Sequence, residues 1–360
     1  MKYFYTFLLL LNICSCQIPT VSEIKNQLIK TNFDNEKKYP LKTLGYITPW
    51  NKEGYEYVEK YTKKFDIVSP TWFELKSDEL DGEFQIILDG SNNIDSAYMK
   101  RIKKNNPNLL ILPRLHAGFN DQTFYKLWFQ KSVDQFIKVL ERRIKYNKFD
   151  GYVFDCIYLW FNENLLNQFT NQLLPKMGKL MKKLNKTLIM TIVPYFPQNV
   201  INKETFKKIA TYVDYFNIMT YDYGQYRISI DKFLSPISWI KDTINYYVDA
   251  ADKDKTELLK KILLGIPYYG YAYDGRNNNQ EGSVTGKQFM NIFHQKEKNL
   301  KINYDKNQEE YHFDTGDGKM ISFPLNNFLN KRLELTKNLN LGGCGIWEIG
   351  NGLEEFLELL

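Results

Sequence analysis

Short apolar segments alternate with longer amphipathic segments along most of the chain. Eight apolar segments predict β-strands, at residues 43–48, 67–71, 109–114, 151–157, 187–194, 215–220, 262–266 and 343–347. Continuous apolar runs of this length are typical of parallel strands that are buried on both faces. The pattern therefore favours a parallel sheet whose strands are joined by helices.

The longer segments carry apolar residues at helical spacing. Residues 132–147 place Val133, Phe136, Leu140 and Ile144 on one stripe, which predicts an amphipathic helix. Residues 162–184 and 325–339 repeat the pattern, and a proline at position 175 predicts a kink or break in the first of these. Eight alternations of strand and helix predict the α/β class and a TIM (β/α)8 barrel.

One interval departs from this alternation. Between the seventh and eighth predicted strands the chain is long and rich in glycine, and it contains strand-like pieces such as residues 311–313. We interpret residues from about 268 to 324 as a small, partly β insertion after the seventh strand. The barrel as a whole is expected to span residues 41–360.

Residues 1–16 have the layout of a secretory signal peptide. Lys2 precedes an apolar run at residues 3–11, and small residues up to Cys16 suit cleavage before Gln17. The run is too short to cross a bilayer as a helix, and the alternative is a buried N-terminal strand. No later segment has 18 uncharged apolar residues, so we expect a secreted or lysosomal protein without a membrane span.

The polar residues 17–40 form a leader segment that either packs against the barrel or stays mobile. Asn185 begins the only Asn-X-Thr sequence suited to glycosylation. Without the signal peptide, the chain keeps Cys156 and Cys344, which the predicted barrel places on well-separated strands. Two cysteines and three histidines in such a chain predict neither a disulfide scaffold nor a metal site, and no cofactor is expected.

The net charge of the chain excludes few classes of function. The chain carries 48 Lys and Arg against 42 Asp and Glu, and only seven of the 48 are Arg. The lysines form no continuous basic block, so we expect no nucleic-acid partner.

Aromatic and acidic residues follow the predicted strands at their carboxyl ends, where barrels of this type carry their sites. They include Trp50, Trp72, Glu74, Trp160, Tyr195, Tyr221, Asp222, Tyr268, Trp347 and Glu348. Flat aromatic rings stack on the apolar faces of sugars, and carboxylates accept hydrogen bonds from hydroxyl and amide groups. The pattern predicts a carbohydrate-binding cleft, with packing at the barrel rim as the alternative for each single aromatic residue.

Three segments carry a more specific signal: FDGYVFDCI at 149–157, MTYD at 219–222 and GGCGIWEIGNGLEEF at 342–356. In this order and spacing the chain resembles glycoside hydrolase family 18, the chitinases and chitinase-like barrels, over roughly residues 41–360. Residues 44–55 and 345–353 resemble one chitinase-like group within that family.

The family signature on the fourth strand is D-G-x-D-x-D-x-E. Asp150, Gly151 and Asp155 match it, whereas Val153 stands at the second Asp and Ile157 at the catalytic Glu. The resemblance implies that this Glu protonates the leaving oxygen while the N-acetyl carbonyl of the substrate attacks the sugar. Loss of a general acid costs about 10²–10⁴ in rate. We therefore expect a chitinase-like binder and no catalytic residue.

The resemblance further implies that Tyr221 and Asp222 hold an N-acetyl group and that Trp347 forms the floor of the sugar pocket. Asp155 either bonds a ligand amide or is a structural carboxylate paired with Tyr221 or Asp222. Further candidates for the cleft are Tyr46, Trp72, Arg114, Tyr195 and Met219.

The first hypothesis is thus a lectin-like protein whose ligand is a chitooligosaccharide or a related N-acetylated glycan. A second hypothesis is a weakly active glycosidase with a relocated acid, Glu74 or Glu348. A third is a protein-interaction module with a vestigial groove, recognised by a scavenger-type receptor or another protein.

Overall fold

The structure is a computed structural model that describes residues 20–27, 33–80, 83–118, 132–226, 232–249, 252–276 and 279–360. The predicted signal peptide, residues 1–16, lies outside the described residues.

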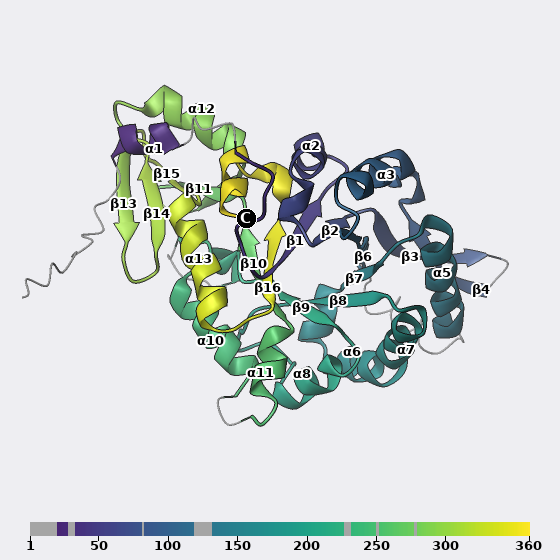
Figure 1. The fold of residues 1–360 in the computed structure, drawn as a ribbon. Helices are drawn as coiled ribbons and strands as arrows, with labels where there is room; N and C mark the ends of the chain where they lie inside the picture. Colours follow the sequence, from purple (N-terminus) through teal and green to yellow (C-terminus); the bar gives the residue numbers. More distant parts are fainter. Residues whose placement is uncertain are drawn as a thin grey trace, which may run out of the picture.

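Parallel strands form a closed barrel (Figure 1). In chain order they are β1 (Lys42–Ile47), β2 (Ile67–Pro70), β3 (Phe73–Leu80), β5 (Leu110–Ile111), β6 (Arg114–His116), β7 (Gly151–Asp155), β8 (Thr187–Ile192), β9 (Tyr215–Ile218), β10 (Ile262–Pro267) and β16 (Gly343–Trp347). The second barrel strand is divided into β2 and β3 and the third into β5 and β6, and β1 closes the ring by pairing with both β2 and β16. Pro113 separates β5 from β6 because proline has no N–H to donate to a ladder. The predicted eight-stranded barrel is confirmed.

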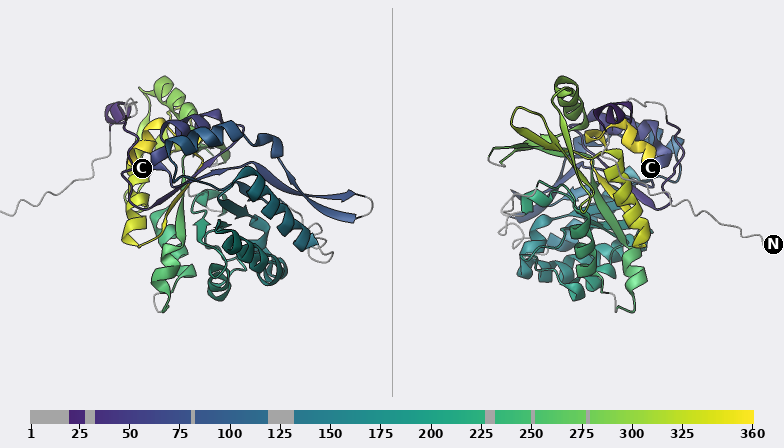
Figure 2. Two further views of the ribbon diagram at one scale, coloured as in Figure 1. Left: turned by 45° about the vertical axis from the view of Figure 1, so that its right-hand side comes forward. Right: turned by 90° about the vertical axis from the view of Figure 1, so that its left-hand side faces the viewer.

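Helices surround the strands on the outside (Figures 1 and 2). Those of the barrel are α2 (Lys52–Lys60), α3 (Ser96–Asn105), α5 (Ser132–Asn147), α6 (Glu163–Gln168), α7 (Leu174–Leu184), α8 (Lys203–Ala210), α10 (Ile237–Tyr247), α11 (Lys255–Lys260) and α13 (Asn326–Asn338). Shorter elements are α1 (Val21–Gln27), α9 (Tyr223–Tyr226), η1 (Thr62–Lys64), η2 (Ser91–Asn93), η3 (Ile157–Phe161), η5 (Ile349–Asn351) and η6 (Glu354–Leu359).

The predicted helices are confirmed, with one refinement. Helix α5 has the bounds that its apolar stripe predicts, and α13 lies within residues 325–339. In the segment 162–184, a π-helical turn, η4 (Phe169–Leu173), joins α6 to α7, and Pro175 lies in the first turn of α7. Leu173 before α7 is itself helical, so Pro175 lies within a continuous helix, and the π-helical turn directly before it is the irregularity that accommodates the missing N–H.

The fourth predicted strand is too long. Strand β7 ends at Asp155, and Ile157 begins the 3-10 helix η3. Inside the barrel, seven side chains form a separate buried cluster: Leu44, Tyr46, Ile67, Leu112, Val153, Ile189 and Leu263. Cys156 and Cys344 belong instead to the larger core between strands and helices, and both are free thiols.

A second sheet lies between β10 and β16. Its antiparallel order is β12 (Gln280–Val284), β11 (Gly270–Asp274), β15 (Lys319–Ser322), β14 (Glu310–Asp314), β13 (Lys301–Asp305), and α12 (Gly286–Lys296) packs on it. This is the small insertion after the seventh strand that the sequence predicts. A further hairpin, β3 with β4 (Glu83–Asp89), projects from the barrel (Figure 2) and was not predicted.

The described part of the leader packs against the barrel. The Tyr39 hydroxyl lies 2.6 Å from the Thr336 hydroxyl, and the Tyr39 N–H donates to the Leu360 carbonyl at 2.8 Å. Ile24 of α1 is fully buried. Over the described residues, none of the helices combines the length and the apolar character needed to cross a membrane.

A buried arginine connects the inserted sheet to the barrel. Arg332 of α13 is fully buried, and its guanidinium donates to the Ser235 carbonyl at 2.6 Å and the Glu309 carbonyl at 2.9 Å. It also lies 3.4 Å from the carboxylate of Glu310 on β14, which accepts the backbone N–H of Ser235. Burial raises the pKa of Glu310 to about 7, although the Arg332 charge opposes that rise.

We expect Arg332→Ala to lower the free energy of unfolding by about 3–5 kcal/mol, because it leaves the Glu310 carboxylate buried without its cation. Urea unfolding at pH 7.5 measures this loss. The matched control is Lys331→Ala on the same helix, whose side chain is 36 % exposed and should change stability by less than about 1 kcal/mol. Equal effects of the two substitutions would contradict the role given to Arg332.

Candidate functional site

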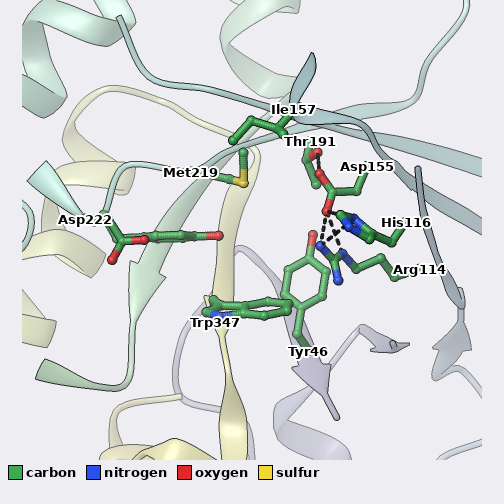
Figure 3. A pocket seen from close by; sticks show the side chains of 10 residues that line it. Tyr46, Arg114, His116, Asp155, Ile157, Thr191, Met219, Asp222 and Trp347 are labelled. Carbon is green, nitrogen blue, oxygen red and sulfur yellow. Dashed lines mark hydrogen bonds and ion pairs between the residues drawn. The ribbon is translucent and has the colours of Figure 1, made fainter. Parts of the chain in front are cut away.

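A pocket of about 220 Å³ opens at the carboxyl ends of the barrel strands. Ten residues line it: Tyr46, Arg114, His116, Asp155, Ile157, Thr191, Met219, Tyr221, Asp222 and Trp347. Figure 3 shows Arg114, His116 and Asp155 grouped on one side and Asp222 on the other, with the Trp347 ring between them along one wall. The strands bring these residues together from positions up to 300 residues apart.

Asp155, the last residue of β7, is the centre of the polar group. Its side chain is buried, and Oδ2 accepts from the Arg114 Nε at 2.7 Å and from a second nitrogen of the same guanidinium. Oδ1 accepts from the Thr191 hydroxyl at 2.5 Å, and the His116 Nδ1 lies 3.5 Å from Oδ2. The structure shows a paired carboxylate, and its described partners are Arg114, Thr191 and His116. Hydrogen bonding of Asp155 to a ligand amide stays a prediction.

These contacts decide the charge of Asp155. Burial by itself would raise the pKa of this carboxyl, but the Arg114 charge and the hydrogen bonds from His116 and Thr191 outweigh burial. The net effect holds the pKa of Asp155 well below its usual range. Asp155 is therefore a carboxylate at any physiological pH and has no proton to donate.

The Trp347 ring at the end of β16 contacts two neighbouring side chains. The Arg114 guanidinium lies 5.0 Å from the ring centre, and the Tyr46 ring meets it edge to face at 5.3 Å. Tyr46 is in turn held by its hydroxyl, which donates to the Asn217 side chain at 2.8 Å. The floor of the pocket is thus a rigid aromatic surface beside a cation.

The opposite side of the pocket is built from the loop after β9. Asp222 has a left-handed backbone, with φ of 63°, and its Oδ1 accepts from the hydroxyls of Tyr269 and Tyr271. Burial raises the pKa of Asp222 while both tyrosine hydrogen bonds lower it, and the net direction is upward. Since Tyr271 belongs to β11, the inserted sheet helps to position this side of the pocket.

An apolar wall closes the remaining side. Figure 3 shows Ile157 and Met219 lying together, with Ile157 on the side of Asp155. Ile157 reaches the pocket although β7 has ended, because η3 begins at this residue. Among the described lining residues, Asp155 and Asp222 are the two with carboxyl groups.

Seven residues selected from the sequence lie outside this lining: the aromatic residues Trp50, Trp72, Trp160, Tyr195 and Tyr268 and the acidic residues Glu74 and Glu348. Trp72 is buried against Phe149 and donates to the Tyr55 hydroxyl, which makes it a packing residue. Tyr195 stacks on Tyr246 at 4.2 Å.

The two proposed relocated acids differ in position. Glu348 is 1 % exposed, and its carboxylate accepts from the Asn51 amide at 2.6 Å and the Gly350 N–H at 3.1 Å. Glu348 is not among the residues that line the pocket, and burial raises its pKa to about 7 although these hydrogen bonds lower it. Its role as a relocated acid stays a prediction. Glu74 is half-exposed and pairs in register with His116 between β3 and β6, at the rim.

The pocket also contains two polar residues that the motifs do not mark, His116 and Thr191. The sequence contains a weak indication of each position. His116 follows Arg114 by two positions and therefore points to the same face of the third strand. Thr191 is a polar residue inside an apolar strand. Across the described residues, no group of three or more His, Cys, Asp or Glu side chains is arranged to hold a metal ion.

Comparison with known proteins decides the family. The sequence profile described as glycosyl hydrolases family 18 matches residues 42–352, which is most of the chain. The chain belongs to glycosyl hydrolases family 18. The relatives of this family 18 barrel are distant in sequence and close in fold.

One relative is the uncharacterized glycosylase YvbX of Bacillus subtilis, which is 23 % identical over 188 residues, or 48 % of this chain. The match spans about half, 51 %, of that curated relative. A chitinase structure from Chromobacterium violaceum superposes with a TM-score of 0.72 at 16 % identity, covering 89 % of this chain and 98 % of the other. The family 18 chitinase of Cycas revoluta, solved with (GlcNAc)3, gives 0.71 at 15 % identity, covering 88 % and 97 %.

The pairing of Asp155 predicts a reversal of pH dependence in this family 18 barrel. In the wild type the folded-state pKa lies below the unfolded value of about 3.9, so the stabilisation by Asp155 is present above that pH and lost only as pH falls further. Arg114→Leu removes the cation and leaves the burial, which moves the folded-state pKa above the unfolded one. We expect about 3–5 kcal/mol less stability at pH 7.5, partly recovered as pH falls through the new pKa.

Urea unfolding between pH 7.5 and 4 measures this recovery. The double variant Arg114→Leu/Asp155→Asn serves as the control, because it has no carboxyl to titrate and should not show it. A single variant whose stability tracks that of the wild type at every pH would refute the ion pair.

Proposed function

We propose that this protein binds oligosaccharides of N-acetylated sugars, chitooligosaccharides or related glycans, in the barrel pocket and does not hydrolyse them efficiently. It acts as a lectin-like member of a hydrolase family. The observation that carries the proposal is the position of Ile157 in the pocket wall next to Asp155. By resemblance this is the position of the family's proton donor, and an isoleucine has no proton to transfer.

The charges in the pocket support the same conclusion. Glycosidic bond cleavage by this family needs a protonated acid at the leaving oxygen. Asp155 stays ionised because Arg114, His116 and Thr191 stabilise its charge. Asp222, which lies across the pocket, has one carboxylate oxygen engaged by two tyrosine hydroxyls. Binding groups are therefore present, and Asp155, the carboxyl group beside Ile157, has no proton to donate.

The binding groups suit an N-acetylated sugar. The exposed part of the Trp347 ring offers a flat apolar surface for the face of a sugar ring, and the carboxylate of Asp222 and the Tyr221 side chain suit the acetamido group. The structure of the Cycas revoluta chitinase contains (GlcNAc)3, which supports a ligand of this class for a barrel of the same fold. Residues 44–55 and 345–353 further resemble the chitinase domain-containing protein 1 group, in which the acid position is apolar.

Entry into the secretory pathway is part of the proposal. It is supported by the apolar run at residues 3–11 and by Asn185, which is exposed at the carboxyl end of α7 and accessible to glycosylation. A secreted or lysosomal protein would meet glycans of this class.

One alternative keeps a structural basis. Glu74 is half-exposed beside His116 at the rim, so a weak glycosidase that uses Glu74 as a displaced acid is a second candidate. Recognition of the outer surface by a receptor protein is a third candidate function. The tests below distinguish both alternatives from carbohydrate binding.

Native mass spectrometry of the protein with (GlcNAc)2 to (GlcNAc)6 is the first test. We expect bound, uncleaved ligand with a preference for length. Trp347→Ala should weaken binding at least about fivefold, because an aromatic contact contributes about 1–3 kcal/mol. Tyr146→Ala, which changes an aromatic side chain that is 82 % exposed outside the pocket, should leave binding unchanged. Absence of any complex would favour the receptor alternative.

Introducing an acid tests the catalytic part of the proposal. Ile157→Glu should hydrolyse (GlcNAc)5 at least about 10²-fold faster than the wild type, since that is the lower range for a general acid. Ile157→Gln has nearly the same shape and no acidic proton, and should remain inactive. Measurable turnover of (GlcNAc)5 by both the wild type and the Gln variant would show that an acid elsewhere, with Glu74 tested first, performs the reaction.

A further inference from the structure

Positive charge is concentrated in one quarter of the chain. Residues 96–186 contain 17 Lys and Arg against six Asp and Glu, whereas the remaining residues contain 31 against 36. The lysines form no continuous block in sequence, but three successive helices, α3, α5 and α7, bring them together. Figure 1 shows these helices following one another along one side of the barrel.

Two adjoining hollows on this side each include three cations among their lining residues, and the second also includes Glu141. Lys100, Lys103 and Lys148 line one hollow of about 530 Å³, and Lys138, Arg142 and Lys145 line the next. Both hollows include Tyr146, whose ring is 82 % exposed at the carboxyl end of α5. We call these six cations and Tyr146 the basic face.

Internal ion pairs account for only part of this charge. Lys103 pairs with Asp150 at 2.7 Å, and Lys145 pairs with Glu141 at 2.8 Å. The structure shows no ion pair from Lys100, Lys138, Arg142 or Lys148 to any of the residues that it describes. Cations near the end of a helix are stabilised by the helix dipole, but Lys138 lies in the first half of α5 and gains nothing from it.

The basic face is separate from the sugar pocket. The helices of the barrel run opposite to the strands, so the carboxyl end of α5 lies at the amino ends of the strands, and the pocket lies at their carboxyl ends. Ile111, near the start of the third barrel strand, lines the first hollow, which agrees with this placement. A ligand on the basic face can therefore bind without touching Trp347 or Asp155.

We propose that the basic face binds a sulfated or carboxylated polysaccharide. A row of exposed cations attracts a linear polyanion, and binding is driven largely by release of the counterions around both. Five of the six cations are lysines, whose compact charges suit sulfate and carboxylate groups and do not read base edges as arginine does. Tyr146, the one aromatic residue in the basic face as defined above, offers one ring for a sugar face. Sequence-independent binding of single-stranded nucleic acid uses several aromatic platforms.

Heparin is the probe for this proposal, with the full chain and titration at several salt concentrations. The double variant Lys138→Glu/Arg142→Glu should weaken heparin binding at least tenfold and reduce the slope of log Kd against log salt concentration by about two, one for each charge lost. The matched control is Lys253→Glu/Lys255→Glu, which makes the same change in net charge at exposed positions beside α11.

Two further variants test whether heparin binds at the basic face itself. Trp347→Ala should leave heparin affinity unchanged, because the sugar pocket is elsewhere. Tyr146→Ala should weaken heparin binding without changing the net charge. Equal losses in the test and control double variants would refute a localised site. Binding of single-stranded DNA as tight as that of heparin at the same salt concentration would refute a polysaccharide ligand and indicate a nucleic acid instead.

Discussion

The ion pair between Asp155 and Arg114 is the interaction on which the pocket depends. A carboxylate at the end of a central barrel strand is costly to bury, and it persists only because a cation and two hydrogen-bond donors surround it. The same guanidinium lies over the Trp347 ring, so one side chain fixes both the charge and the aromatic floor. Without Arg114, Asp155 would be protonated or the floor would lose its support.

The proposed function makes this family 18 barrel a binding scaffold, and the arrangement of the pocket suits that role. The groups that recognise a sugar need fixed positions, and the barrel supplies these from the ends of different strands. The group that transfers a proton needs a poised pKa, and neither Ile157 nor the ionised Asp155 provides one. Under the proposed function, replacing the one acidic side chain by Ile157 removes the proton donor and leaves the polar contacts around Asp155 and Asp222 in place.

The barrel and much of its site follow from local pattern. Parallel strands buried on both faces are continuous apolar runs, and their carboxyl ends share one edge, so Tyr46, Asp155 and Trp347 were expected to meet. The partners of Asp155 were not predictable, because a hydrogen bond between β7 and β8 depends on register rather than on any motif. Trp72 was predicted to line the cleft because it follows a predicted strand. It lies instead between β2 and β3, and its side chain belongs to the core between strands and helices. Distance along the chain also concealed the clustering of lysines on three helices.

The hydrogen bonds from Tyr269 and Tyr271 to Asp222 have a consequence for the inserted sheet. Tyr271 lies on β11, so the pocket and the small sheet share a contact, and Arg332 joins that sheet to the barrel from the other end. By linkage, a ligand that needs Asp222 in this position stabilises every state in which β11 is folded. Local unfolding of the inserted sheet would then become rarer as more of the pocket is occupied by ligand. The ligand would change the population of partly unfolded conformations and not the shape of the folded protein.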